Sequence, residues 1–137
     1  MNIFIDCDIL LDVVFSKEPF YQASSELLNY LETKGNGFIA AHSISNFYYL
    51  TSHNKQQSKL FISEVAAFLN LVPLSNQELA VALELTFEDF EDSLQCALAM
   101  SCEADVIISR HAKNYDHSPV LTLTPEAFLK SLQRAIA

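Results

Sequence analysis

The chain has 137 residues, of which 50% are hydrophobic and 18% are charged, as expected for one domain with a buried core. Its 17 acidic residues outnumber its 8 lysines and arginines, and the net charge of −9 argues against a broad basic surface for nucleic acid. Only two glycines are present, Gly35 and Gly37, which excludes the glycine-rich loops that cradle phosphates. We therefore expect a single domain over residues 1–137 with a small local site.

The cysteines and the N-terminal segment indicate the compartment. The three cysteines form no C-x-x-C motif, and such a sparse, odd set is typical of reduced thiols in the cytosol. The first six residues lack a basic segment and include a charge, unlike a secretory signal, and no apolar run is long enough for a membrane helix. The sequence predicts a cytoplasmic protein that does not enter a membrane.

Short apolar runs alternate along the chain with segments of helical periodicity. The first half is predicted to contain a strand at 3–5, a helix at 19–34, a strand at 38–40, a helix from Ser43 or Ser45 to about 51, and a helix at 58–69. The second half is predicted to contain a strand at 72–74, helices at 75–85 and 87–103, strands at 106–108 and 120–123, and a helix from 125. This alternation predicts an α/β fold, a parallel sheet covered on both faces.

Several residues predict where helices begin and end. Gly35 is well suited to the left-handed conformation after a helix, and Ser75 is a good N-terminal cap. Thr86 is expected to cap the helix that follows it, with Asp89 at the third position of that helix. Thr124, followed by proline at the first helical position, is expected to open the last helix.

The functional site is expected beyond the carboxyl ends of the strands, where open parallel sheets bind ligands. Asp6 closes the first predicted strand, at the edge of a core in which an isolated charge is costly. A hard cation such as Mg²⁺ or Mn²⁺ would compensate such a charge, because these ions prefer oxygen ligands. Equally, Asp6 could cap a turn by accepting backbone N–H groups. The sequence leaves both interpretations open.

A second acidic group lies at the start of the helix that precedes the 106–108 strand. Asp89 and Asp92 are three residues apart and are expected to share a helix face. Acidic residues in a first turn also complement the helix dipole, and we interpret Glu88 and Glu91 as surface charges of this kind. Asp92 lies beside apolar positions of the helix and is therefore expected to reach the edge of the sheet. His42 follows another strand and is interpreted as a polar residue, not as a metal ligand.

Five segments, in order along the chain, resemble motifs of the VapC-like branch of the PIN domain family. Residues 4–12 are similar to F-x-D-T-N-V-L-L-D, residues 43–50 to S-x-T-N-x-Y-Y-L, residues 89–95 to D-F-E-D-A-L-Q, residues 104–110 to A-D-x-I-V-T-R, and residues 123–129 to L-T-P-E-E-F-L. The resemblance covers almost the whole chain. It implies a three-layer α/β/α sandwich around a parallel sheet and a ribonuclease that depends on Mg²⁺ or Mn²⁺.

The resemblance also implies roles for individual residues. Asp6 and Asp92 would be the main metal ligands and catalytic acids, with Asp89 as an auxiliary acid and Ser43 or Asn46 near the ligands. Several members are toxins held inactive by a cognate antitoxin, so RNA is the implied substrate, an antitoxin is an implied partner, and a homodimer is suggested.

The chain departs from the family pattern at three places. Asp8 adds a carboxylate where the family has an amide, and Asn46 stands near a position where many members have glutamate. In the loop after the 106–108 strand, the last acidic residue of the family motif is Asn114. Asp116 is two residues further on and is expected to substitute as a metal ligand if the loop bends, while Arg110 is expected near the substrate.

Two other functions remain open at this point. The substitutions at Asn46 and Asn114 suggest a catalytically reduced PIN-like module that only binds a partner. Asp6-Cys7-Asp8 is also similar to the D-x-D motif of haloacid-dehalogenase-like phosphotransferases, in which the first Asp is a nucleophile. Leu10 stands where that motif has Thr or Val, which disfavours phosphotransfer. The ribonuclease interpretation requires the carboxyl groups of Asp6 and Asp92 to converge.

Overall fold

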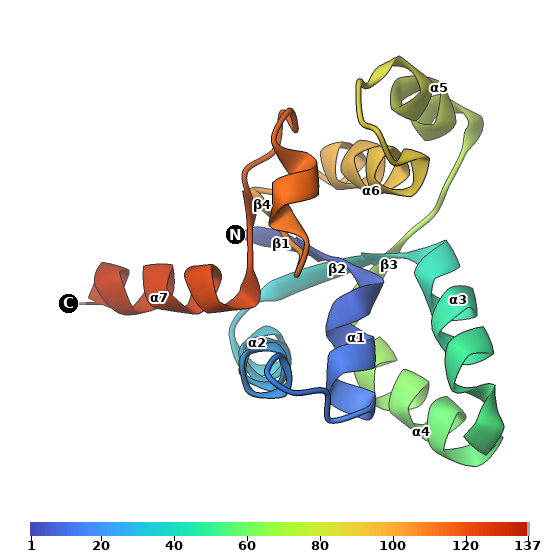
Figure 1. Cartoon of the computed structure of the whole chain (residues 1–137), viewed down its shortest axis with the longest axis vertical. Helices are drawn as coiled ribbons and strands as arrows, with labels where there is room; N and C mark the ends of the chain where they lie inside the picture. Colours follow the sequence, from blue (N-terminus) through green and yellow to red (C-terminus); the bar gives the residue numbers. More distant parts are fainter. Residues whose placement is uncertain (137) are drawn as a thin grey trace.

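The computed structural model describes residues 1–136 and has a five-stranded sheet at its centre (Figure 1). All neighbouring strands run parallel, with β1 in the middle of the order β3-β2-β1-β4-β5. The strands are β1 (Asn2–Ile5), β2 (Asn36–Ala40), β3 (Leu69–Val72), β4 (Val106–Ile108) and β5 (Thr122–Leu123). The chain builds one half of the sheet first and then crosses over β1 to build the other half.

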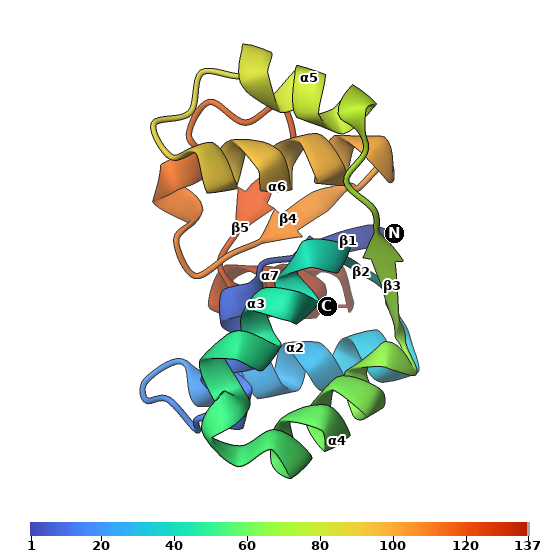
Figure 2. The same ribbon diagram turned by 90° about the vertical axis from the view of Figure 1, so that its right-hand side faces the viewer.

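Helices cover both faces of this sheet, which confirms the predicted α/β/α sandwich. Helices α5 and α6 lie on one face, and α1, α2 and α4 lie on the other (Figures 1 and 2). The helices are α1 (Cys7–Val14), α2 (Tyr21–Thr33), α3 (Ala41–Thr51), α4 (Lys55–Ala66), α5 (Asn76–Glu84), α6 (Phe90–Ser101) and α7 (Pro125–Ile136), with short 3₁₀ turns at Ser52–Asn54 and Ala112–Tyr115. No helix within residues 1–136 is long and apolar enough to cross a membrane.

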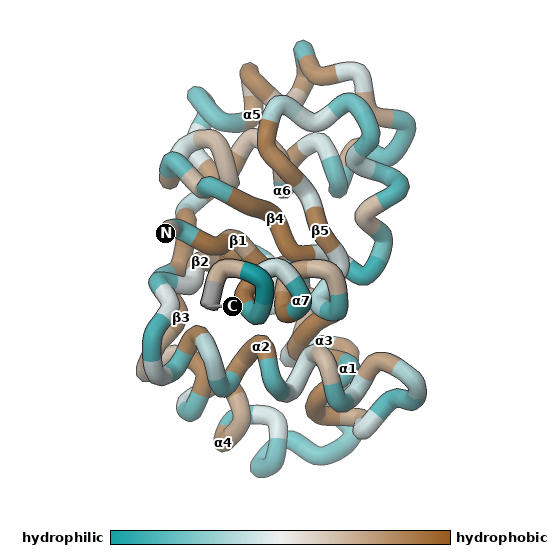
Figure 3. Tube along the Cα trace, turned by 90° about the vertical axis from the view of Figure 1, so that its left-hand side faces the viewer, coloured by the Kyte–Doolittle hydropathy of each residue, from teal (hydrophilic) through white to brown (hydrophobic). Residues whose placement is uncertain are grey.

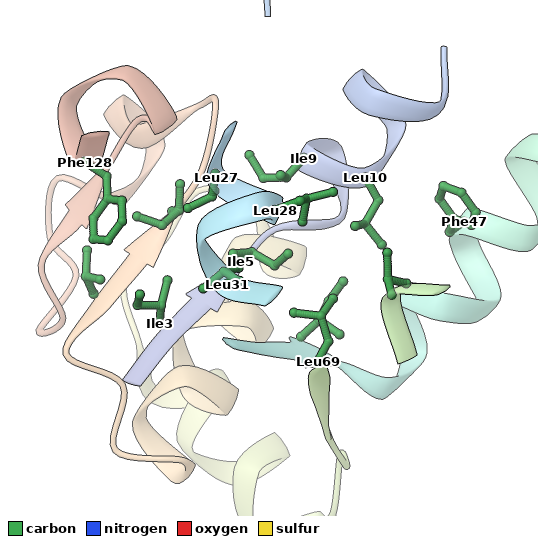
Figure 4. Close-up of a cluster of buried hydrophobic side chains, with 14 residues drawn as sticks. Ile3, Ile5, Ile9, Leu10, Leu27, Leu28, Leu31, Phe47, Leu69 and Phe128 are labelled. Carbon is green, nitrogen blue, oxygen red and sulfur yellow. The ribbon is translucent and has the colours of Figure 1, made fainter. Parts of the chain in front are cut away.

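The central strand is buried on both sides because its side chains alternate between two hydrophobic clusters. Ile3 and Ile5 belong to the larger cluster, under α1 and α2 (Figure 4), whereas Phe4 packs on the α6 side. All three side chains are fully buried. Colouring by hydropathy accordingly shows β1 and β4 as hydrophobic (Figure 3). A charged residue that directly follows such a strand starts at the border of the core.

Two predicted helix starts are confirmed by hydrogen bonds. Ser75 caps α5, and its backbone N–H and hydroxyl both bond to Glu78 in a capping box. Thr124 accepts a bond from the N–H of Ala127 at 3.2 Å and opens α7. These caps are local, which is why the sequence predicts them correctly.

Other boundaries were predicted wrongly. The third strand ends at Val72 and does not include Pro73, since a proline cannot donate to the ladder. Helix α6 is capped by Asp89, which accepts from the N–H of Glu91 at 2.8 Å, and Thr86 lies outside it. Asp89 is therefore the N-terminal cap of α6, and Asp92 lies three residues later, within its first turn.

Gly35 does not have the predicted left-handed conformation, because no glycine in residues 1–136 has a positive φ. A Cβ atom at Gly35 would lie 2.8 Å from Cδ2 of Leu31, so the glycine lets the chain that leaves α2 pack closely against the last turns of this helix. Helix α3 begins at Ala41, ahead of the expected Ser43 or Ser45, and α4 begins at Lys55 because Asn54 caps it. Helix α1 was not predicted at all.

Candidate functional site

Asp6 links the two central strands to helix α1. Its backbone N–H donates to the carbonyl of Ile108 at 3.0 Å, which ties the end of β1 to the end of β4. Its carboxylate accepts a bond from the N–H of Asp8 at 3.4 Å and caps α1, and it accepts a second bond from the hydroxyl of Ser109 at 3.2 Å. Asp6 thus has the capping role that the sequence left open. It also lies at the switch point of the sheet, the usual ligand site of this architecture.

The carboxyl group of Asp6 is destabilised in its charged form. Burial first, and then the negative charges of Asp8 and Asp92, raise the pKa of Asp6 to about 6, against the lowering effect of its two hydrogen bonds. Since Asp92 is 86 positions away in the chain, its influence on Asp6 means that the fold brings the two carboxyl groups toward one region.

Asp92 lies in the first turn of α6 and is half-buried. It accepts a hydrogen bond from the hydroxyl of Tyr115 at 3.2 Å, and burial, followed by the charge of Asp89, raises the pKa of Asp92. The pKa of the buried Tyr115 phenol is also raised, with both Asp6 and Asp92 among the causes after burial itself. The Tyr115 hydroxyl therefore contacts Asp92 directly, and the negative charges of Asp6 and Asp92 both disfavour its deprotonation.

Arg110 is turned toward α1. Its guanidinium lies 3.7 Å from a carboxylate oxygen of Asp8 and 3.5 Å from one of Asp12, and it stacks on the ring of Phe20 at 4.5 Å. Asp8 also pairs with Nε2 of His111 at 3.3 Å. Because only 16% of the Arg110 side chain is exposed, this residue chiefly anchors α1 to the loop after β4.

Two pockets flank this arrangement. The pocket beside Asp6 has a volume of about 360 Å³ and is formed by residues of α1, α3 and α6, namely Asp6, Cys7, Asp8, Leu11, Asn46, Tyr49, Leu50, Glu91 and Gln95. The other has a volume of about 420 Å³ and lies between the start of α6 and the loop after β4, lined by Thr86, Phe87, Glu88, Asp89, Asp92, Lys113, Asn114, Asp116 and His117. Most of the predicted site residues are thus divided between two pockets, and Ser43 and Arg110 line neither.

This division separates some residues that the sequence grouped together. Asp116 shares a pocket with Asp92 and Asn114, whereas Asn46 shares the other pocket with Asp6. Ser43 is buried behind the Asp6 pocket, where its hydroxyl accepts a 3.5 Å bond from Nε2 of Gln95.

Four residues near the carboxylates were missed by the sequence analysis: Ser109, Tyr115, Glu91 and Gln95. Ser109 directly follows β4, and this position after a strand is a signal that could have identified it. Glu91 was interpreted as a surface charge; it is exposed, and it also lines the Asp6 pocket. Its spacing of four residues from Gln95 on one helix is a usable signal, since such pairs are neighbours.

The donor set is suited to a hard cation with a water shell. Asp6, Asp8 and Asp92 offer carboxylate oxygens, the donors that Mg²⁺ and Mn²⁺ prefer. Within residues 1–136, no three His, Cys, Asp or Glu side chains are grouped so as to hold a metal ion together. Mg²⁺ usually keeps several waters and needs only one or two carboxylates. The carboxylates at this edge of the sheet therefore have the chemistry to hold such an ion with water in its remaining positions.

Comparisons with known proteins agree with this fold. The chain is 26% identical to Ribonuclease VapC1 of Aquifex aeolicus over 134 residues, covering 93% of this chain and 92% of that protein. Its structure is similar to VapBC2 from Rickettsia felis bound to a promoter DNA fragment, with a TM-score of 0.69 and 15% identity over 90% of this chain and 98% of that one. It is also similar to a toxin-antitoxin complex from Klebsiella pneumoniae, with a TM-score of 0.69 and 18% identity over 90% and 97% of the two chains. The family model described as PIN domain matches residues 2–113, and the chain belongs to this family.

Proposed function

We propose that this protein is an endoribonuclease that depends on Mg²⁺ or Mn²⁺ and is the toxin of a toxin–antitoxin pair. The observation that carries the proposal is the position of Asp6, a partly buried carboxylate at the switch point of the sheet. The charges of Asp8 and Asp92 add to the effect of burial, and the pKa of Asp6 is raised to about 6. A divalent cation would relieve that repulsion. The similarity to a protein named as a VapC ribonuclease supports RNA as the substrate.

Asp6 and Asp92 would hold the cation, which when bound supplies activation of water and stabilisation of the negative charge that develops on the scissile phosphate. Ser109 orients Asp6 through its 3.2 Å hydrogen bond, and Tyr115 orients Asp92 in the same way. Asp89 acts through the start of α6, because its carboxylate holds the N–H of Glu91 and so fixes the turn that carries Asp92. Both catalytic carboxylates are thereby positioned before any substrate arrives.

The proposed substrate contacts are few, as expected for a chain with a net charge of −9. Lys113 and Asn114 line the pocket of Asp92 and are suited to a phosphate and to a base or sugar. Asn46 and Tyr49 are exposed at the pocket of Asp6, where an aromatic ring can stack on an unpaired base. Arg110 would act indirectly, by holding Asp8.

We further propose an antitoxin as the protein partner, in keeping with the structural similarity to toxin–antitoxin complexes. A basic segment would fit the acidic pockets around Asp6 and Asp92. A homodimer and a cytoplasmic location remain predictions from the sequence.

The ribonuclease proposal is tested by incubating the purified protein with a mixture of structured RNAs and Mn²⁺ or Mg²⁺. Cleavage is expected with either ion and is expected to stop with a chelator and in Asp6→Asn. Glu32→Gln, a change of an exposed acid on α2, is the matched control and should cleave normally. Equal cleavage by the wild type and Asp6→Asn would overturn the proposal.

The alternative is a PIN domain that binds its partner without cleaving RNA. It is favoured by the amides Asn46 and Asn114 and by the lack of a three-residue acidic group within residues 1–136. Calorimetric titration with Mn²⁺ separates the two functions. A binding module would take up no ion at Asp6, whereas the enzyme should show saturable binding that is lost in Asp6→Asn.

A further inference from the structure

The pocket beside Asp6 contains two polar side chains of α6 that the cleavage mechanism above does not use. Glu91 and Gln95 lie one helical turn apart and line this pocket together with Asp6 and Asp8. Asp92 lies on the other side, in the neighbouring pocket. Glu91 and Gln95 are therefore the polar side chains that α6 contributes to the pocket of Asp6.

Gln95 has a buried acceptor without a partner. Its side chain is 1% exposed, and its amide nitrogen donates to Oε1 of Glu91 at 3.2 Å and to the hydroxyl of Ser43 at 3.5 Å. A carboxylate only accepts hydrogen bonds, so the nitrogen of Gln95 must face Glu91, and this fixes the position of the amide oxygen. Within residues 1–136, that oxygen has no hydrogen-bond partner. A buried acceptor in this state is costly unless a ligand or a bound water donates to it.

Glu91 is held in place by two donors. Nε2 of His42 lies 3.1 Å from Oε1 of Glu91, and the amide of Gln95 reaches the same oxygen. Within residues 1–136, both hydrogen bonds of the Glu91 carboxylate use Oε1, which leaves Oε2 for a ligand in the pocket. The charge of Glu91 raises the pKa of Cys7 and of Asp92, so the carboxylate lies close to both sides of the site.

Glu88 shows that acidic residues at the start of α6 are not equivalent. It lies three positions before Glu91 but lines the neighbouring pocket with Asp92. The carboxylate of Glu91 is bonded to His42 and to the buried Gln95. Complementing the helix dipole alone would not require such contacts. Glu88 therefore provides a matched control for the charge of Glu91.

We propose that Glu91 and Gln95 accept hydrogen bonds from the water molecules around a divalent cation held at Asp6. This inference rests on the proposed function, because it assumes a cation at that residue. Waters in the shell of Mg²⁺ or Mn²⁺ are donors toward the protein, and these two side chains carry acceptors for them, Oε2 of Glu91 and the buried amide oxygen of Gln95. The added negative charge of Glu91 compensates for the neutral Asn46, which faces the same pocket.

The test is Mn²⁺ titration of the full chain by calorimetry, without RNA. Glu91→Gln and Gln95→Met are each expected to weaken Mn²⁺ binding by about 10- to 100-fold, the usual effect of removing a group that orients a metal's surroundings. Glu88→Gln should bind as the wild type does, and Asp6→Asn should lose binding. Thermal unfolding without Mn²⁺ checks that each variant is folded. If Gln95→Met does not fold, Glu91→Gln still decides, since it changes an exposed carboxylate.

The possible outcomes separate this inference from the proposed function. Unchanged Mn²⁺ affinity in Glu91→Gln, with binding lost in Asp6→Asn, overturns the role of Glu91 and leaves the ribonuclease proposal intact. Equal weakening in Glu88→Gln and Glu91→Gln also overturns it, because the effect is then one of overall charge. A wild type that binds no Mn²⁺, or an Asp6→Asn variant that binds it normally, overturns both.

Discussion

The hydroxyl of Tyr115 donates a 3.2 Å hydrogen bond to Oδ1 of Asp92, and this bond joins the loop after β4 to the first turn of α6. The ring of Tyr115 is buried and packs edge-on against Phe87 at 5.5 Å, so its hydroxyl has a fixed direction. The carboxylate of Asp92, which we propose as a metal ligand, is thus oriented by a residue 23 positions further along the chain.

Tyr115→Phe is expected to lower the free energy of unfolding by about 1–2 kcal/mol at pH 8, since a hydrogen bond to a charged group is lost while the ring is kept. The difference should shrink at a pH at which Asp92 is protonated. Urea unfolding at the two pH values measures it. Tyr49→Phe is the control, because the Tyr49 side chain is 80% exposed. An equal effect of both substitutions would contradict the proposed orientation of Asp92.

The raised pKa of Asp6 predicts a specific pH dependence of stability. The native protein holds this proton up to about pH 6, whereas an unfolded aspartate loses it at about pH 4. The contribution of Asp6 is therefore fully favourable below about pH 4 and is lost as the pH rises through about 6, a decrease of about 3 kcal/mol. Asp6→Asn, measured by urea unfolding with a chelator, should be more stable than the wild type at pH 7.5 by about this amount.

The same variant should also show a flatter stability profile between pH 4 and pH 6.5, with a remaining slope from Asp12 and Asp92, whose pKa values are raised as well. Loss of cleavage together with a gain in stability is typical of a charged residue that is needed for function but destabilises the folded state. A destabilised Asp6→Asn at neutral pH would show that capping α1 outweighs the electrostatic strain.

Substitutions of Asp89 separate its capping role from the predicted role as an auxiliary acid. Asparagine is as good a helix cap as aspartate, so Asp89→Asn should retain stability and most of the cleavage activity. Asp89→Ala removes the bond to the N–H of Glu91 and should cost about 1 kcal/mol. Thermal unfolding and RNA cleavage are measured on both variants. Stable Asp89→Asn protein without cleavage would establish a direct chemical role instead.

The contact between Asp12 and Arg110 predicts that substitutions of these two residues have strongly non-additive effects on the free energy of unfolding. Asp12 is fully buried and lies 3.5 Å from Arg110, with a further 3.4 Å bond from the hydroxyl of Ser24. Asp12→Ala leaves the arginine without its buried partner and should cost about 3–5 kcal/mol. Asp12→Leu combined with Arg110→Met should recover much of this loss. A double-mutant cycle from urea unfolding provides the coupling energy, and additive effects would show that the pair is not coupled.

Residues at the strand ends could be identified from the sequence because their signals are local. Asp6 follows an apolar run and Ser75 starts a capping box, and both features lie within a few residues of chain. Helix α1 was missed because it begins at Cys7, directly after Asp6 and the end of β1, so that no turn residues separate the strand from the helix. The start of α6 was misplaced since Thr86 and Asp89 are both good caps, and only the packing of the chain selects between them.

The sequence by itself determined the α/β alternation, the PIN-domain resemblance and the acidic character of the strand ends, because these depend on composition and short-range order. The tertiary structure decided which acids share a pocket: Glu91 lies with Asp6, and Asp116 lies with Asp92. It also turned Arg110 inward and left the oxygen of Gln95 without a partner within residues 1–136. These relationships depend on how α3, α6 and the loop after β4 meet at the edge of the sheet, and such distances in space are not encoded in spacing along the chain.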